Sequence, residues 1–192
     1  MKKRKQFEKE LNSSKRKKLM IRIKTRHPDG DCFDSVVLEN QKDFVVLQDF
    51  HDFESGGIVF VPKKWISGFR NGEFEKNFNK ILRFIGDRKY IHPNEKFKKF
   101  KSFKEIFEYL KAKDVWPIIE IVFKRSAVLY IGPITEVNDN SFKIYCYDAN
   151  GKWEKNYKLN FRELFRMEID SKYAKYFNKY MRAKGGRIRN AK

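Results

Sequence analysis

The most reactive side chains of this sequence gather in one stretch, HPDGDCFD, which runs from His27 to Asp34. A cysteine attacks as its thiolate, so Cys32 would need a base within hydrogen-bond reach to act as a nucleophile. The aspartates beside the histidine are metal-ligand types, but their spacing lacks the downstream glycine and bidentate glutamate of an EF-hand. We therefore interpret PDGD as a turn, and we predict neither a metal site nor a cofactor.

The motif DGDCF resembles the nucleophile motif of the ovarian-tumour family of cysteine deubiquitinases, in which the cysteine opens a helix and a distant histidine activates it. This sequence departs from that pattern twice. The residues after Cys32, SVVLENQKDFVVLQ, are strand-like, and no histidine follows His92 to supply the usual C-terminal base. Cys32 also aligns with Tyr130 of an internal repeat, a position that ordinary barrel structure explains. We predict no catalytic residue.

Two cysteines, Cys32 and Cys146, occur in the 192 residues. They provide neither a disulfide framework nor a CxxC pair for zinc, so a reducing compartment is favoured and we expect a cytoplasmic protein. No apolar run approaches the roughly 20 residues that span a bilayer, and no apolar segment follows the charged first stretch. We expect no membrane partner.

The positive charge lies mostly outside two near-neutral segments. Of the formal net charge of +19, residues 1–18, 88–104 and 182–192 carry +7, +6 and +5, whereas residues 19–87 and 105–181 carry −1 and +2. Basic arms beside near-neutral domains are a common layout for binding phosphate backbones. The alternative is that the lysine-rich ends only keep the protein soluble.

An internal repeat accounts for the near-neutral segments. FEKNFNKIL (Phe74–Leu82) matches YAKYFNKYM (Tyr173–Met181) at an offset of 99, and SVVLENQKDFVVLQ matches PITEVNDNSFKIYC at an offset of 98. A repeat of this kind decides how the whole fold is interpreted. Each copy is predicted to form several short strands and then a helix.

The second copy carries the clearest strand signal. Phe142, Ile144 and Cys146 alternate with Lys143, Tyr145 and Tyr147, which is typical of a half-buried strand. The following DANG then predicts a hairpin loop with glycine at a position of positive φ.

Three helices are predicted from apolar spacing and capping residues. Phe74–Ile85 and Tyr173–Met181 carry apolar stripes that we expect to be core, with Gly86 ending the first helix and Ser171 capping the second. Between the copies, SFKEIFEYLKAKD begins with Ser102 and Glu105 in capping-box spacing, and this helix must end before Pro117.

Five short strands, a turn of the VPKKWI type before the last strand and a closing helix look like a small SH3-like or Sm-like barrel. Over about residues 19–182 the sequence resembles a bacterial family of uncharacterised tandem-barrel proteins. That resemblance implies a mainly β fold with α: two tandem barrels, each followed by a short C-terminal helix and joined by a helical linker. It offers no catalytic or binding residues, although small barrels often bind RNA, DNA or peptides. The predicted segments are 1–18 (basic N-terminal arm), 19–87 (first barrel repeat with closing helix), 88–114 (basic linker with helix), 115–181 (second barrel repeat with closing helix) and 182–192 (basic C-terminal tail).

A nucleic-acid-binding protein of this design would contact phosphates with its arms and stack unpaired bases on aromatic side chains of the second hairpin. The alternative is that the other copy or the linker helix covers that hairpin face. The candidate nucleic-acid-binding residues are Lys15, Arg16, Lys17, Lys18, Lys98, Lys99, Lys101, Arg187, Arg189, Tyr145, Tyr147 and Trp153.

We therefore predict a non-enzymatic, cytoplasmic bacterial protein that associates with nucleic acid, with RNA favoured over DNA. The second hypothesis is a protein-interaction module that uses a barrel groove or a sheet edge, with the arms only solubilising the chain. A cysteine protease at Cys32 ranks third.

Overall fold

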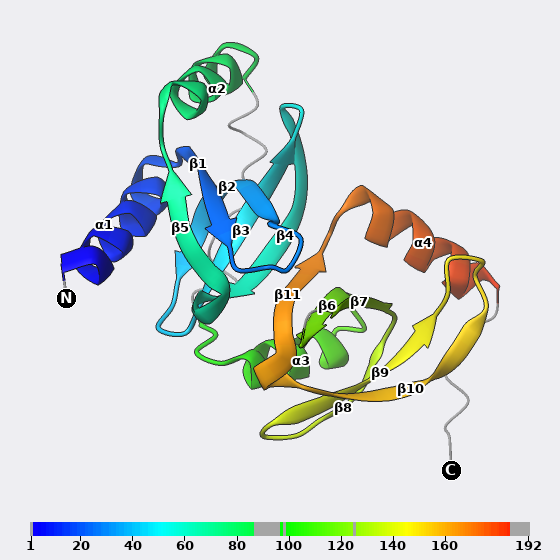
Figure 1. Cartoon of the computed structure of the whole chain (residues 1–192). Helices are drawn as coiled ribbons and strands as arrows, with labels where there is room; N and C mark the ends of the chain where they lie inside the picture. Colours follow the sequence, from blue (N-terminus) through cyan, green and yellow to red (C-terminus); the bar gives the residue numbers. More distant parts are fainter. Residues whose placement is uncertain (1, 87–96, 98, 125, 185–192) are drawn as a thin grey trace.

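The computed structural model describes residues 2–86, 97, 99–124 and 126–184, and its two lobes are seen side by side in Figure 1. The first lobe consists of α1 (Lys2–Lys17), β1 (Met20–Thr25), β2 (Cys32–Asn40), β3 (Phe44–His51), β4 (Glu54–Pro62), the 3-10 turn η1 (Lys63–Trp65), β5 (Ile66–Arg70) and α2 (Glu73–Phe84). The second consists of α3 (Phe103–Ala112), β6 (Ile118–Phe123), β7 (Ser126–Ile131), β8 (Ile134–Val137), β9 (Ser141–Tyr147), β10 (Trp153–Asn160), the 3-10 turn η4 (Phe161–Glu163), β11 (Leu164–Ile169) and α4 (Lys172–Ala183).

The strands form open sheets, so the prediction of two closed barrels is wrong, although the mixture of mainly strands with helices is confirmed. One sheet has the order β5-β1-β2-β3-β4-β11-β6-β7, and the other has the order β10-β9-β8. The first lobe does not close on itself because the outer edge of β4 pairs with β11, where Met167 lies opposite Phe60. The second does not close because its chain leaves β7 at Gly132 and Pro133 and joins the smaller sheet as β8.

The two lobes nevertheless share one order of strand pairing. β1 lies between β5 and β2, and β6 lies between β11 and β7. The registers also correspond: Val46 lies opposite Phe60 on β3 and β4, and Lys143 lies opposite Lys158 on β9 and β10. Both lobes then continue through a 3-10 turn, a last strand and a helix, with η1 and η4 offset by 98 residues.

These registers correct the sequence alignment at Cys32 by one residue. Ile23 of β1 lies opposite Phe33 on one side and Phe69 on the other, and Ile119 of β6 lies opposite Tyr130 and Met167 in the same way. The counterpart of Tyr130 is therefore Phe33, which is buried, and not Cys32, which is exposed.

Residues 1–18 do not form a free basic arm, because residues 2–17 form the helix α1 and pack on β2. Leu11 is fully buried in the core of the first lobe. Ser14 Oγ donates to the carbonyl oxygen of Leu19 and accepts from the amide of Val37. A polar helix is thus held by one buried leucine and one buried hydroxyl, and its removal would expose the core.

The helix boundaries follow their capping residues. Ser102 Oγ accepts from the amide of Glu105 at the start of α3, and Ser171 Oγ accepts from the amide of Ala174 at the start of α4, so both predicted N-caps are confirmed. Gly86 follows α2 with a φ of 77°, the left-handed conformation that ends a helix. α3 ends at Ala112, before Pro117, as predicted.

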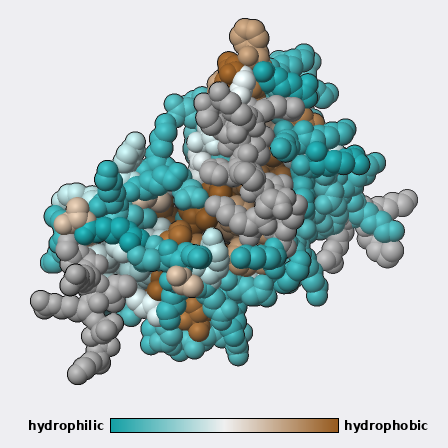
Figure 2. Space-filling model, turned by 180° about the vertical axis from the view of Figure 1, so that it is seen from behind, coloured by the Kyte–Doolittle hydropathy of each residue, from teal (hydrophilic) through white to brown (hydrophobic). Residues whose placement is uncertain are grey.

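The closing helices bury only part of their apolar stripes. In α2, Phe78 and Leu82 of the predicted stripe are buried, whereas Phe74 and Ile81 are 50% and 41% exposed, and Ile85, directly after the helix, is 47% exposed. Figure 2 shows hydrophobic atoms projecting at the top of the molecule, where α2 lies in Figure 1. In α4, Met181 of the predicted stripe is buried and Phe177 is half-buried, whereas Tyr173 and Tyr180 are 51% and 49% exposed. The prediction that these stripes are core is therefore confirmed for Phe78, Leu82 and Met181 and wrong for the exposed side chains. In the described part of the chain, no helix is long and apolar enough to cross a membrane.

Candidate nucleic-acid interface

The outer face of the sheet β8–β10 carries a row of charged side chains. Lys143 in the middle strand β9 lies opposite Glu136 on one side and Lys158 on the other. Glu136 binds Lys143 with an oxygen–nitrogen distance of 2.5 Å, and this contact together with an Asn138 hydrogen bond lowers the pKa of Glu136. One carboxylate therefore serves two facing lysines. Like charges directly opposite each other destabilise a sheet. An anion bound beside Lys143 and Lys158 would therefore reduce their repulsion.

Two aromatic rings lie next to this row. The rings of Tyr145 and Trp153 are stacked, with centroids 4.8 Å apart and an angle of 5° between their planes. Both side chains are half-buried, so part of each remains open to solvent. Tyr145 shares its face of β9 with Lys143, because residues two apart in a strand point to the same side. We define the outer face of β8–β10 by Glu136, Lys143, Tyr145, Trp153 and Lys158.

Helix α4 borders this face and adds cations to it. Arg182 lies 4.1 Å above the ring of Trp116 and binds the carboxylate and the carbonyl oxygen of Asp114. Trp116 meets Trp153 edge-on, with ring centroids 5.8 Å apart. A ladder of planar groups therefore runs from Arg182 through the two tryptophans to Tyr145.

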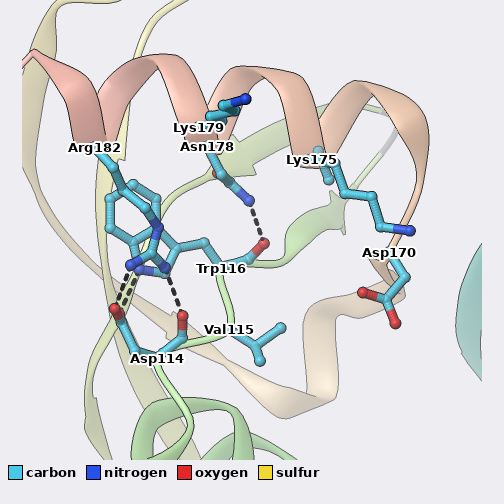
Figure 3. Close-up of a pocket in the computed structure, with 9 residues that line it drawn as sticks. Asp114, Val115, Trp116, Asp170, Lys175, Asn178, Lys179 and Arg182 are labelled. Atoms are coloured by element: carbon cyan, nitrogen blue, oxygen red, sulfur yellow. Dashed lines mark hydrogen bonds and ion pairs between the residues drawn. The ribbon is translucent and has the colours of Figure 1, made fainter.

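A hollow of about 300 Å³ lies at the α4 end of this ladder (Figure 3). Lys175, Asn178, Lys179 and Arg182 line it from one side of the helix, above Trp116. Asn178 donates to the carbonyl oxygen of Trp116, which fixes the helix to the start of β6. Among the residues that the structure describes, Lys175 and Lys179 form no ion pair, so their charges are open to a ligand.

The first lobe shows how differently the same positions can be used. Val46 and Phe60, the counterparts of Lys143 and Lys158, are both fully buried in the main hydrophobic core. Gln48, which lies opposite Ile58 as Tyr145 lies opposite Asn156, is also fully buried. The corresponding surface is thus covered in one lobe, and in the other it is open and carries lysine and tyrosine.

Tyr147 does not belong to the open face, contrary to the prediction. It is 5% exposed and packs under α4, where its ring is stacked on Phe177 at 5.4 Å. Its hydroxyl donates to Asn178 at 2.7 Å, and burial raises the pKa of that hydroxyl. Tyr147 anchors the helix, and Tyr145 and Trp153 are the aromatic side chains left at the surface.

The predicted basic residues do not converge on one site. Lys15 is paired with Glu39 at 2.5 Å, while Arg16, Lys17 and Lys18 are exposed at the end of α1, in the first lobe. Lys99 lies over the rings of Phe100 and Tyr109, and Lys101 is exposed before α3. Lys98, Arg187 and Arg189 lie outside the described residues. Figure 1 places α1 and β9–β10 at opposite ends of the molecule, so α1 and the hairpin aromatics are not brought together.

Sequence reasoning missed Lys143, Lys158, Lys175, Lys179 and Arg182. Lys143 could have been found, because it alternates with the buried Phe142 and Ile144 and so shares a face with Tyr145. Lys158 can be assigned to this face only from the register between β9 and β10. The cations of α4 can be assigned to it only from the packing of that helix beside the sheet.

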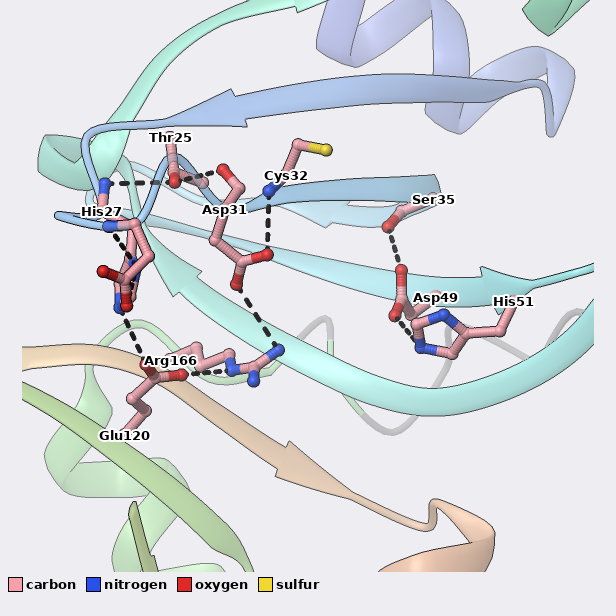
Figure 4. Close-up of polar contacts among 10 residues, drawn as sticks. Thr25, His27, Asp31, Cys32, Ser35, Asp49, His51, Glu120 and Arg166 are labelled. Atoms are coloured by element: carbon pink, nitrogen blue, oxygen red, sulfur yellow. Dashed lines mark hydrogen bonds and ion pairs between the residues drawn. The ribbon is translucent and has the colours of Figure 1, made fainter. Parts of the chain in front are cut away.

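Cys32 does not face a base. Its thiol points away from His27 in Figure 4, and its amide donates to Asp31 at 3.0 Å. His27 instead lies 2.8 Å from Glu120, which also accepts from Arg166 at 2.7 Å. This buried network joins the β1–β2 loop to β6 and β11, so we assign His27 a structural role between the lobes. The predicted turn at PDGD is confirmed: the amide of Gly30 donates to the carbonyl oxygen of His27, and Gly30 has a φ of 71°.

Ser35, Asp49 and His51 form a second cluster of reactive residue types (Figure 4). Ser35 Oγ donates to one oxygen of Asp49 at 3.0 Å, and His51 lies 3.1 Å from the other oxygen. A serine nucleophile needs the histidine beside it, whereas here the aspartate separates the two. This cluster therefore does not activate the serine. Within the described residues, no group of three or more His, Cys, Asp and Glu side chains is placed to hold a metal ion.

Comparisons with known proteins found no matching family model, no matching curated protein and no matching solved structure. The assignment of function therefore depends on the geometry of the outer face of β8–β10.

Proposed function

We propose that this protein binds single-stranded RNA on the outer face of β8–β10 and the adjoining side of α4. The observation that carries the proposal is the stacked, half-exposed pair Tyr145 and Trp153 beside two facing lysines. Bases stack on aromatic rings with about 1–3 kcal/mol per base, and every base has a π-face, so such a surface tolerates many sequences.

The arrangement suits an unpaired strand better than a duplex. In a duplex the base faces are stacked on one another, whereas an unpaired strand can splay a base onto Tyr145 or Trp153. Lys143 and Lys158 lie within the same sheet face, where they can contact the phosphates on either side of a stacked base. The exposed Lys175 and Lys179 extend the positive surface along α4.

The described residues suggest a division of roles. Glu136 holds Lys143 in place until a phosphate competes for it. Arg182 is held by Asp114 over Trp116, and Trp116 supports the edge of Trp153. We therefore assign contact with RNA to Tyr145, Trp153, Lys143 and Lys158, and positioning to Trp116 and Arg182.

A binding titration with single-stranded oligouridylate, followed by anisotropy of a labelled strand, tests this proposal. We expect Tyr145→Ala to weaken binding by about 1–3 kcal/mol and Tyr145→Phe to have little effect, because stacking needs the ring and not the hydroxyl. Replacing both Lys143 and Lys158 by alanine should flatten the salt dependence by about 1.4 units of slope, since each lost phosphate contact contributes about −0.7.

Replacing Lys76 and Lys80 on α2 by alanine serves as the control, because it removes the same charge far from the outer face. Equal loss of affinity in the control and in the double variant of Lys143 and Lys158 would show that only net charge matters. The absence of measurable binding to RNA at low salt would refute the proposal. A parallel titration with oligodeoxythymidylate shows whether DNA binds equally well.

A further inference from the structure

The edge strand β7 differs from the other strand edges of the molecule. β5, at the opposite end of the same sheet, carries Arg70, and its Phe69 is in ring contact with Phe7 of α1 at 6.1 Å. β10 carries Lys155 and Lys158 along its edge, and β8, the other edge of the smaller sheet, carries Glu136 and packs against α3. Charged residues and covers of this kind protect sheet edges from pairing with other chains.

In the part of the chain that the structure describes, β7 has neither kind of protection. Its sequence, SAVLYI, contains no charged residue, and Val128 and Leu129 are 46% and 56% exposed. Its only strand partner among the described residues is β6. Phe123 lies opposite Ser126 with two residues between them in the sequence, so the alternation of an antiparallel ladder directs the backbone groups of Ala127 and Leu129 outward.

The first lobe uses the corresponding stretch differently. Because Tyr130 corresponds to Phe33, β7 corresponds to residues 29–34, which carry Asp29, Asp31 and Asp34 and precede the pairing of β2 with β3 that begins at Ser35. In the second lobe the pairing with β9 likewise begins beyond β7, where the amide of Tyr145 donates to the carbonyl oxygen of Pro133. β7 and the end of β9 therefore remain separate, and the charged residues of the first lobe are missing from β7.

The space between them is a cleft of about 390 Å³, which we name the β7 cleft. Its lining is apolar and aromatic on the sides of β7, β10 and α4, and it includes two carboxylates, Asp148 and Glu154. Among the described residues that line it, none is a lysine or an arginine. The chain has a formal net charge of +19, whereas the charged side chains in this cleft are carboxylates. These carboxylates would repel a phosphate group. Its lining residues are Val128, Leu129, Tyr130, Ile131, Cys146, Tyr147, Asp148, Ala149, Glu154, Tyr157, Tyr173 and Phe177.

We propose that β7 binds an extended segment of a partner protein, which adds to the sheet as an antiparallel strand. Its main chain pairs with the outward groups of Ala127 and Leu129, its apolar side chains fill the β7 cleft, and a lysine or arginine lies beside Asp148 and Glu154. Main-chain pairing supplies affinity in this mode of recognition, and the pockets for side chains supply specificity. A second copy of this chain fits less well, because its own large positive charge opposes association.

Synthetic peptides of about eight residues, long enough to span the strand, test this inference on the full-length protein. The first probe alternates valine and lysine, the second alternates valine and glutamate, and the third is the valine–lysine peptide with N-methylated central amides. We expect the first to bind about tenfold or more tightly than the other two, with amide shifts in NMR spectra centred on Ala127 and Leu129.

Two variants test the strand edge and the carboxylate of the cleft separately, and a third variant is the control. Leu129→Lys should remove binding, because it places on β7 the kind of charge that protects β10, whereas Asn140→Lys adds the same charge on an exposed loop and should leave binding nearly intact. Glu154→Gln should weaken only the valine–lysine peptide, since the amide oxygen can still accept from Tyr157, as Glu154 does at 3.0 Å.

Three results would overturn the inference. The first is equal binding of all three peptides. The second is binding that is unchanged in the Leu129→Lys variant. The third is a dimer of the free protein that dissociates on Leu129→Lys, because a second copy would then occupy the edge. These readouts contain no nucleic acid, so they are independent of the RNA-binding proposal.

Discussion

Lys143 and Lys158 lie directly opposite each other on the antiparallel strands β9 and β10, and the single nearby carboxylate in their row, Glu136, is bound to Lys143. Val46 and Phe60 occupy the same register positions in the first lobe and are buried there. A facing pair of lysines costs stability, and a bound anion would offset the part of this cost that Glu136 does not. The relationship therefore links folding stability and ligand binding through the same two residues.

Lys158→Glu should stabilise the fold and reduce RNA binding at the same time. The substitution turns a like-charge cross-strand pair into an opposite-charge pair, which is worth about 0.2–1 kcal/mol. Urea unfolding should show a higher midpoint for the variant, and the anisotropy titration should show weaker binding than Lys158→Ala gives. A lower midpoint than that of the native chain would contradict the idea that the lysines repel each other.

Leu11→Ala should destabilise the protein by about 2–5 kcal/mol, because it leaves a cavity where a fully buried side chain has been removed. Deleting residues 1–18 should unfold the first lobe, although the sequence alone suggests that this basic segment is dispensable. Circular dichroism during urea titration measures both effects. Lys9→Ala, on the exposed side of α1, is the control and should change stability by less than about 0.5 kcal/mol.

The sequence predicts local structure well where one residue determines it. Ser102 and Ser171 mark their helices because a side-chain oxygen satisfies a free amide at the first turn. The alternation of Phe142, Ile144 and Cys146 identifies the buried face of β9, and all three are buried. These signals depend only on neighbours along the chain.

The remaining features depend on contacts between distant segments. The edge of β4 pairs with β11 of the other lobe and not with an edge of its own lobe. Nothing in the residues of either strand predicts this pairing or excludes a closed barrel. The packing of α1 depends on a few side chains, Phe7, Leu11 and Ser14, within a strongly polar segment, so its charge pattern is indistinguishable from that of a solvated arm. For the outer face of β8–β10, the sequence supplied Tyr145 and Trp153, but the facing lysines required the register.

Gly132→Ala should disrupt the bend between β7 and β8. Gly132 has a φ of 150°, and a Cβ atom there would clash with the carbonyl oxygen of Tyr145. Both effects destabilise, and together they should cost about 3 kcal/mol or more. Gly68→Ala is the matched control, because a Cβ there meets nothing within 4 Å. Thermal unfolding of the two variants compares them directly, and equal midpoints would show that the bend can relax.

Asp49 should make the protein less stable as the pH rises toward neutrality. Burial raises the pKa of this carboxyl from 3.8 to about 6, against the opposing effects of His51 and the Ser35 hydrogen bond, and Glu168 raises it further. The folded state then binds the proton more tightly than the unfolded state does. The stability from this group is therefore fully present below about pH 4 and is lost as the pH rises through about 6.

Asp49→Asn tests this directly, because the asparagine oxygen can still accept from Ser35 but no longer carries a buried charge at neutral pH. We expect the variant to be more stable than the native protein by about 1–3 kcal/mol at neutral pH and to lose this advantage toward pH 4. Urea unfolding at several pH values between 4 and 8 measures the difference. Asp43→Asn, at an exposed position, should give a difference that does not vary over this range. A variant that is less stable than the native protein at neutral pH would show that the ion pair with His51 outweighs the cost of burial.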